Sequence, residues 1–297
     1  MMKNSDKVRG ALFGVAVGDA LGATVEFMDA GAIKAKYGSL REIMGGGWLN
    51  LVAGEVTDDT QMTIAVAEGI VESPNNPVPA VGKRFVKWMD SRPKDVGSTC
   101  AVAISFAKKF KTWDGIGEYA NTYLHGKSAG NGSLMRTVYP GLWYSNDQQA
   151  MTAAMRISEM THYDFKASTA CAAYTGMIYG LVRGWDLVGT LTGFIDELPR
   201  EYDLMCIMDG VDLKPSGYVV DSFKCALHAI LTTDNFEDAL IKAVNMGGDA
   251  DTIGAITGGL AGAYYGYDAI PMRWKEKLMP DVREKLDDLA DKAVDNV

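Results

Sequence analysis

The sequence has 297 residues, of which 47% are hydrophobic and 23% are charged, and this composition is typical of a soluble globular protein. The formal net charge of -9 at pH 7 argues against a general nucleic-acid-binding protein, which would carry a basic surface. Four cysteines without a CxxC pair argue against a disulfide framework or a zinc ribbon, and they favour a reducing, cytoplasmic compartment.

The first predicted helix covers residues 8–27 and has a glycine at every fourth position. A second glycine stripe with the same spacing follows in residues 253–266, and such spacing places each stripe along one helical face. Glycine is about 1 kcal/mol less favourable than alanine inside a helix, so each stripe needs a packing reason. We expect the two helices to lie centrally, with their axes within the ~8–10 Å of ordinary close packing. The stripes are Gly10, Gly14, Gly18 and Gly22, and Gly254, Gly258, Gly262 and Gly266.

The same N-terminal stretch has the layout of an export signal, with basic residues before an apolar run over residues 11–17. However, Asp19 stands just before the small-residue segment that would mimic a cleavage site, and Gly14 interrupts the apolar run. We therefore expect no export signal. No uncharged apolar run reaches the ~18 residues of a membrane span, so we expect no transmembrane segment.

Two predicted helix starts carry more acidic and hydroxyl side chains than a helix cap requires. A cap accounts for one such residue at each start, where a carboxylate also suits the positive end of the helix dipole. Hard divalent cations take several oxygen ligands, and an all-oxygen set favours Mg²⁺ or Mn²⁺ over Zn²⁺. Caps and a two-metal site both remain open. The residues are Thr57, Asp58 and Asp59 at one start, and Asp249, Asp251 and Thr252 at the other.

Further candidate residues stand in loops and at helix ends between these two starts. Glu26 stands at the end of the first glycine-striped segment. Its side chain is either a solvated carboxylate or a residue of the site. Three glycines precede Trp48, whose indole either packs in a plain turn or covers a ligand. Asp95 is suited to cap the helix that we expect over residues 100–110.

A glycine-rich turn over residues 129–136 would offer backbone N–H groups to phosphate oxygens. Its Arg136 either forms a structural salt bridge or faces an anion. His162 directly follows a helix expected over residues 150–161, where a lone histidine is commonly a cap or packing residue. Tyr218 lies in a loop from which its ring could stack on a ligand.

Helical periodicity dominates the rest of the chain, and alternating strand patterns are scarce. A charged amphipathic helix is expected over residues 274–297. No repeat of fixed length, linker or low-complexity tract interrupts the sequence. Because the motifs near its two ends must meet in space, we predict one all-α domain over residues 1–297.

Together these motifs resemble the ADP-ribosylglycohydrolase family. They occur in the family's order and cover nearly the whole chain, and their combination is far more specific than any one of them. The motifs are Val17-Gly-Asp-Ala-Leu-Gly22 with Glu26, Thr57-Asp-Asp-Thr60, Gly130-Asn-Gly132 with Met135-Arg136, Thr161-His162, and Gly247-Gly-Asp-Ala-Asp-Thr252. Four further runs resemble the branch of the family that acts on dinitrogenase reductase: Gly22 to Phe27, Gly45 to Trp48, Ser91 to Gly97 and Tyr218 to Asp221.

The resemblance implies an orthogonal all-α bundle with a binuclear Mn²⁺ or Mg²⁺ site at converging helix N-termini. The implied activity is removal of ADP-ribose from an arginine side chain, and the implied protein substrate is the nitrogenase iron protein. A cytoplasmic monomer with no nucleic-acid partner is expected. The implied ligands are Thr57, Asp58, Asp59, Asp249, Asp251 and Thr252, with Asp251 between both ions.

The resemblance also implies roles at the reacting bond and at the ligand. Glu26 would be a ligand or hold a water, and Asp95 would approach the ribose and the scissile bond, with Asp58 beside the chemistry. ADP-ribose would contact Asn131, Gly132, Ser133, Leu134 and His162, while Tyr218 would stack near its adenine or ribose. Ser133 and Leu134 depart from the smaller residues common in relatives, which affects the expected pocket shape.

The chemistry required is cleavage of an N-glycosidic bond through an oxocarbenium-like transition state. Two cations would orient the ribose and stabilise developing negative charge, and a carboxylate would handle the proton of the attacking water. Two other functions remain open: a hydrolase of another ADP-ribosyl linkage, to serine or an acyl group, and a non-catalytic ADP-ribose-binding protein.

Overall fold

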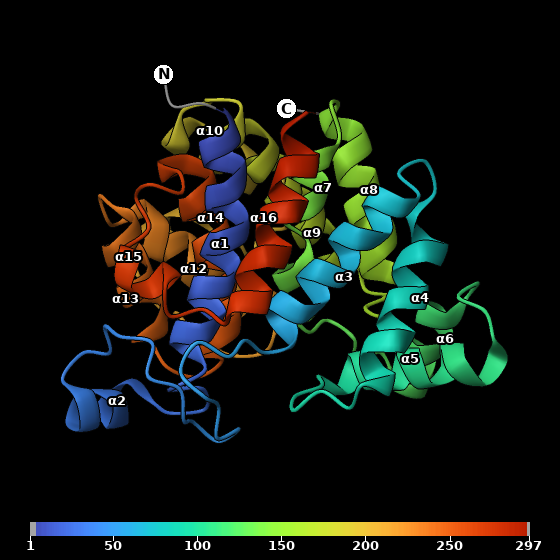
Figure 1. Ribbon diagram of the computed structural model, residues 1–297, viewed down its shortest axis with the longest axis horizontal. Helices are drawn as coiled ribbons and strands as arrows, with labels where there is room; N and C mark the ends of the chain where they lie inside the picture. The colour runs from blue at the N-terminus through green and yellow to red at the C-terminus, as the bar shows by residue number, and fades with distance from the viewer. Residues whose placement is uncertain (1–3, 296–297) are drawn as a thin grey trace.

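The computed structural model describes residues 4–295, which form helices joined by loops, with isolated β-bridges and no strand (Figure 1). This confirms the all-α prediction, whereas the single domain expected over residues 1–297 stays a prediction. The helices are α1 (Asn4–Gly22), α2 (Ala30–Tyr37), α3 (Asp58–Glu72), α4 (Pro77–Asp90), α5 (Ser98–Phe110), α6 (Ile116–Tyr123), the short 3-10 helix η1 (Leu134–Arg136), α7 (Tyr139–Trp143), α8 (Asp147–Glu159), α9 (Phe165–Val182), α10 (Leu187–Asp196), α11 (Leu204–Asp209), α12 (Val219–Leu231), α13 (Phe236–Val244), α14 (Ala250–Tyr265), α15 (Met272–Lys275) and α16 (Pro280–Val294).

Helices α1 and α14 form the centre of the fold and lie side by side in Figure 1. Their glycine stripes face each other, and a Cβ placed on Gly14 would lie 2.0 Å from the carbonyl oxygen of Gly258. Gly18 meets Gly254 in the same way, again at 2.0 Å. No side chain fits between the two backbones, which is the packing reason that the stripes required. The predicted close packing of these two helices is confirmed, and it joins the two ends of the chain.

Several predicted helix bounds are wrong, since α1 already begins at Asn4 and the helix expected over residues 150–161 covers Asp147–Glu159. The first helix ends at Gly22 rather than at residue 27, and residues 23–27 form turns that finish at Phe27 with φ 63°. The last segment is not one helix from residue 274, because α15 ends at Lys275 and α16 starts at Pro280. Residues 296 and 297 of that prediction lie outside the described chain. Ending α1 early brings Glu26 onto a loop that folds back over the start of α14.

Neither acidic helix start uses a side-chain cap. Thr57 stands at the N-cap of α3 and Asp249 at the N-cap of α14, but neither side chain accepts a hydrogen bond from the first turn of its helix. Asp95 does not cap α5 either, because Gly97 holds the N-cap position. The capping alternative therefore leaves these oxygen atoms unexplained.

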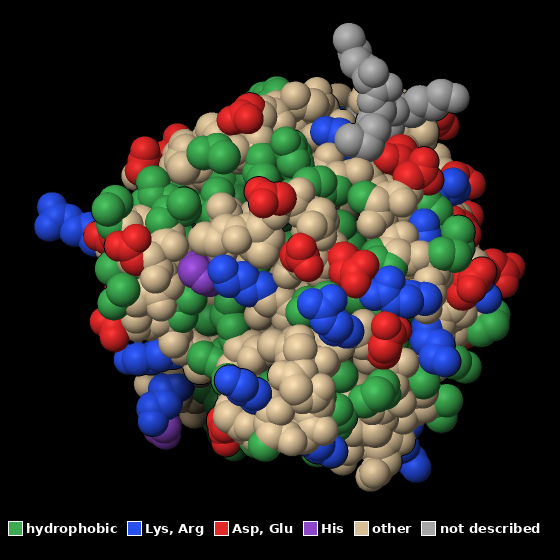
Figure 2. All heavy atoms as spheres, turned by 90° about the vertical axis from the view of Figure 1, so that its left-hand side faces the viewer, with side chains coloured by type: hydrophobic (Ala, Val, Ile, Leu, Met, Phe, Trp, Pro, Cys, Tyr) green, Lys and Arg blue, Asp and Glu red, His purple; other side chains and the backbone are tan. Residues whose placement is uncertain are grey.

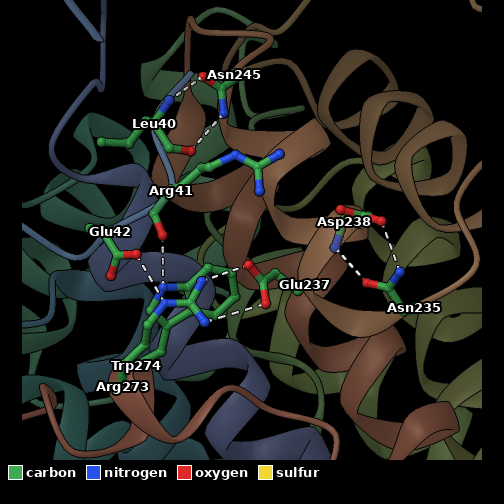
Figure 3. A network of polar contacts seen from close by, with 9 residues as sticks. All are labelled: Leu40, Arg41, Glu42, Asn235, Glu237, Asp238, Asn245, Arg273 and Trp274. Carbon is green, nitrogen blue, oxygen red and sulfur yellow. Dashed lines mark hydrogen bonds and ion pairs between the residues drawn. The ribbon is translucent and has the colours of Figure 1, made fainter. Parts of the chain in front are cut away.

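The loop between α2 and α3 is fixed to the C-terminal helices by a polar network (Figure 3). Asn245 accepts from the backbone N–H of Leu40 and donates to its carbonyl, at 2.8 and 2.9 Å. Arg273 pairs with Glu42 and Glu237, and the indole of Trp274 donates to a backbone carbonyl nearby. These contacts hold one end of the loop that carries Trp48.

The surface shown in Figure 2 mixes cationic and anionic side chains and carries no continuous basic area. Among the described residues, no helix is long and apolar enough to cross a membrane.

Candidate functional site

Eight separate parts of the chain converge on one cavity of about 380 Å³. This volume lies within the ~300–1,000 Å³ range of small-molecule sites. The cavity lies where α3 and α14 begin, with α5 and the turn before η1 on the other side. The predicted site residues that line it are Glu26, Asp58, Asp95, Asn131, Gly132, His162, Asp249, Asp251 and Thr252.

Three carboxylates on one wall could hold a metal ion. Glu26, Asp249 and Asp251 each offer an oxygen, and these oxygens all lie within 4.8 Å of one another. Asp251 is only 2% exposed, and the first turn of α14 fixes its position. Asp249 and Asp251 are predicted ligands, and Glu26, predicted to be a ligand or to hold a water, lies where it could be the third donor.

The first turn of α3 supplies the neighbouring carboxylates and is held by Asp19 of α1. Fully buried, Asp19 accepts hydrogen bonds from the backbone N–H and hydroxyl of both Thr57 and Thr60, at 2.5–3.1 Å. The hydroxyl of Thr57 also lies 3.0 Å from Asp59 Oδ2. Because its carboxylate is already used in this way, Asp19 orients the turn that carries Asp58 toward the cavity.

Burial and mutual repulsion raise the pKa values of these carboxyl groups. Burial raises the pKa of Glu26 to about 7, with Asp95 and Asp249 adding repulsion. Burial likewise raises the pKa values of Asp58, Asp59 and Asp251 well above their usual range, and their acidic neighbours add to each shift. A cation bound among these carboxyl oxygens would favour their ionised form, because its positive charge offsets both the burial and the mutual repulsion.

The donor set fits a hard divalent cation. All of the predicted ligands offer carboxylate or hydroxyl oxygens, which Mg²⁺ and Mn²⁺ prefer. Asp59 Oδ1 is buried without a hydrogen-bond partner in the described chain, a costly state that a cation would relieve. The structure thus shows an acidic cluster that could bind metal.

Hydrogen-bonding groups form the opposite wall. Asn131 Nδ2 donates to Asp249 Oδ2 at 2.7 Å and so links the two walls. The backbone of Asn131 is fixed in turn, because its N–H donates to the carbonyl of Gly217 at 3.0 Å. His162 is 2% exposed and lies against Gly132, where an added Cβ would come within 3.2 Å of the imidazole. The glycine-rich turn therefore leaves room for both the histidine and a ligand.

Three predicted substrate contacts are not among the residues that line the cavity. Ser133 is buried and accepts a hydrogen bond from Ser158 at 2.9 Å, and Leu134 is fully buried in the core. Tyr218 is the N-cap residue of α12, next to the cavity-lining Gly217, and its hydroxyl accepts from Lys166 Nζ at 2.8 Å.

The structure also adds residues that the sequence did not assign to the site. The indole of Trp48 is 50% exposed and donates to Glu26 Oε2 at 2.5 Å, so it is neither simply packed nor free. Phe27 packs beside it, with ring centroids 5.5 Å apart. The two rings form an aromatic rim over the acidic wall. The glycines before Trp48 were the one signal for this in the sequence.

The chain is similar to known proteins over essentially its full length. The sequence model of the family described as ADP-ribosylglycohydrolase matches residues 2–297. An ADP-ribosyl-[dinitrogen reductase] glycohydrolase from Rhodospirillum rubrum is 36% identical over 95% of this chain and 93% of that protein. An ADP-ribosylarginine hydrolase from Serratia proteamaculans (strain 568) is 30% identical over 96% of this chain and 78% of that protein.

A solved structure shares both the fold and the sequence similarity. It is titled as an ADP-ribosylglycohydrolase-related protein complex, with a TM-score of 0.83 and 31% identity over 100% of this chain and 99% of that one. A family match over nearly all residues, a relative above 30% identity and the shared helical fold lead to one conclusion. The chain belongs to the ADP-ribosylglycohydrolase family.

Proposed function

We propose that this protein is a metal-dependent hydrolase that releases ADP-ribose from a modified arginine side chain of another protein. The observation that carries the proposal is the cluster of Glu26, Asp249 and Asp251 in a cavity that also contains Asp95 and Asp58. Two of the relatives are named for ADP-ribosylarginine or for ADP-ribosylated dinitrogen reductase. The nitrogenase iron protein is therefore the proposed target, and the proposed setting is a cytoplasmic monomer.

Two divalent cations would be held by Thr57, Asp58, Asp59, Asp249, Asp251 and Thr252, with Glu26 as a further donor. Bound there, Mn²⁺ or Mg²⁺ would supply positive charge to ribose hydroxyls and to developing negative charge. Asp19 fixes Thr57 and Thr60 in the first turn of α3, from which Asp58 lines the cavity, whereas Thr57 and Asp59 are not among the lining residues.

Asp95 is the proposed proton acceptor at the scissile bond. It lies in the loop before α5 and lines the cavity together with Asp58. Burial raises its pKa, and this makes the carboxylate a stronger base toward a water that attacks the ribose. Asn131 and His162 on the opposite wall would bind and orient the ADP-ribose.

The test compares release of ADP-ribose from arginine-linked and serine-linked peptides, each with and without added Mn²⁺. We expect Mn²⁺-dependent release from the arginine-linked peptide. If the serine-linked peptide were preferred, the substrate would be ADP-ribosylserine rather than ADP-ribosylarginine. If the protein bound both peptides but released ADP-ribose from neither, it would be a non-catalytic ADP-ribose-binding protein.

The role of Asp95 is tested with Asp95→Ala, which should bind ADP-ribose normally and lose about 10²–10⁴-fold in turnover. Asp114→Ala is the control, because Asp114 is exposed and does not line the cavity. Near-normal turnover by Asp95→Ala would remove Asp95 from the mechanism.

A further inference from the structure

A fully buried arginine lies behind the histidine wall of the cavity. Arg136 of η1 is 0% exposed, and its guanidinium lies 4.5 Å from the centre of the Phe85 ring. Within residues 4–295 it forms no ion pair with a carboxylate. The salt bridge considered from the sequence is therefore absent, and the positive charge is balanced through neutral hydrogen-bond acceptors.

One of these acceptors connects the arginine to the cavity. Arg136 Nη2 donates to Thr161 Oγ1 at 2.8 Å, and Thr161 Oγ1 lies 2.8 Å from His162 Nδ1. Thr161 is fully buried and His162 lines the cavity. A continuous chain of hydrogen bonds thus runs from the buried cation to the imidazole.

The direction of the first hydrogen bond follows from its donor, and that of the second is the point that the inference decides. A guanidinium can only donate, so Thr161 Oγ1 must accept from Arg136. The hydroxyl keeps its own hydrogen to donate, and we infer that it donates to His162 Nδ1, which lies at 2.8 Å, rather than to the neighbouring thiol of Cys100. An imidazole that accepts at Nδ1 carries its proton on Nε2 when it is neutral.

The surroundings keep the imidazole neutral. Burial, and then the charge of Arg136, lower the pKa of His162 to about 3. A second cation beside Arg136 would have no compensating carboxylate in contact with it, so protonation of both ring nitrogens is disfavoured near neutral pH.

The Nε2 side of the ring faces the glycine-rich turn. A Cβ on Gly132 would lie 3.2 Å from Nε2, closer than ordinary contact, and one on Gly130 would lie in contact at 3.4 Å, so the two glycines keep this side of the ring open. The described residues contain no hydrogen-bond partner for Nε2. A donor so placed and left unused within the protein is available to a ligand.

We propose that Arg136 and Thr161 are positioning residues that fix His162 as the Nε2–H tautomer, so that it donates a hydrogen bond to an oxygen of ADP-ribose. The inference rests on the proposed function only for the identity of the ligand. ADP-ribose offers phosphate and ribose oxygens as acceptors. The opposite tautomer would direct a lone pair at such an oxygen, which is repulsive.

The tautomer can be measured without any substrate. The chain contains three histidines, and His228 provides an internal contrast because its Nδ1 lies 2.6 Å from the carbonyl of Ile207 and must donate there. Long-range ¹H–¹⁵N spectra of ¹⁵N-histidine-labelled protein above neutral pH should show protonated Nε2 for His162 and protonated Nδ1 for His228. Variants His162→Asn and His228→Asn assign the signals.

A protonated Nδ1 on His162 would overturn the proposal. The hydroxyl of Thr161 would then donate elsewhere, for which the neighbouring thiol of Cys100 is available. Because this readout involves no catalysis, it fails or succeeds independently of the proposed hydrolase activity.

The role in binding is tested with Thr161→Val and its matched control Thr161→Ser. Valine removes the hydroxyl at similar volume, whereas serine keeps it. Thr161→Val should mix the two His162 tautomers and raise the Kd for ADP-ribose about 3- to 10-fold, the size expected for one neutral hydrogen bond. Thr161→Ser should restore the wild-type tautomer and Kd. Equal Kd values in folded Thr161→Val and wild type would contradict the proposal, and if the valine variant does not fold, the wild-type spectrum still decides.

Discussion

Replacing Gly14 with alanine tests whether the fold depends on the direct backbone contact between α1 and α14. The new Cβ would lie 2.0 Å from the carbonyl oxygen of Gly258, whereas ordinary contact begins at 3.4 Å. The difference means that the helices must separate by about 1.4 Å at this point. The obstacle is backbone, so no side chain can rotate away to relieve it.

The cost should therefore fall at the upper end of the ~1–3 kcal/mol found for overpacked cores. Alanine regains about 1 kcal/mol of helix propensity over glycine, which leaves a net destabilisation of about 2 kcal/mol. The unfolding entropy is ~2.1 cal/mol/K per residue. For a chain of this length, a destabilisation of about 2 kcal/mol therefore lowers Tm by about 3 °C. Differential scanning calorimetry with full metal loading is the assay.

Gly193→Ala is the matched control, because Gly193 is an exposed position inside α10 and an added Cβ there meets nothing within 4 Å. The same chemical change should raise stability by about 0.5–1 kcal/mol at that position. If Gly14→Ala were as stable as wild type, or more stable, the argument from backbone contact would be refuted.

Three further predictions concern the cavity. Gly22→Ala should weaken Mn²⁺ binding more than Gly14→Ala does in isothermal titration calorimetry, because its Cβ would lie 2.5 Å from Asp251 Cα and displace that ligand. Equal affinities for the two variants would contradict this. Trp48→Phe should move the acid limb of the pH–activity profile to higher pH. In the wild type, the hydrogen bond from the indole lowers the pKa of Glu26, so removing the indole should raise that pKa. An unchanged or lower limb would exclude that coupling. Mn²⁺ affinity should weaken as pH falls through about 7, where Glu26 takes up the proton that a bound cation must displace. A flat pH dependence would remove Glu26 from the metal site.

The glycine stripes predicted the centre of the fold well, because spacing of four residues has a direct meaning on a helix. The helix ends were less accessible. The turns after Gly22 depend on Phe27 adopting a positive φ, which an aromatic residue rarely signals. Pro280 did carry a signal for the start of α16, since proline favours the first turn of a helix.

The sequence predicted the acidic and hydroxyl side chains at the two helix starts as candidate metal ligands, because each start holds more side-chain oxygen atoms than a helix cap needs. Asp19 was not readable as their support, since a single aspartate in an apolar helix has no local partner. Its partners, Thr57 and Thr60, lie about forty residues further along the chain. The polar chain from Arg136 to His162 was hidden for the same reason, because only the folded chain brings Arg136 against Thr161.

The most direct test of the central proposal is the rate of ADP-ribose release from an ADP-ribosylarginine peptide by metal-stripped protein as Mn²⁺ is added back. We predict negligible release without metal and a saturable rise with Mn²⁺, which Asp251→Ala abolishes while the variant stays folded. Release at an undiminished rate from the metal-free protein, or full recovery by Asp251→Ala, would contradict a metal-dependent site built on these carboxylates.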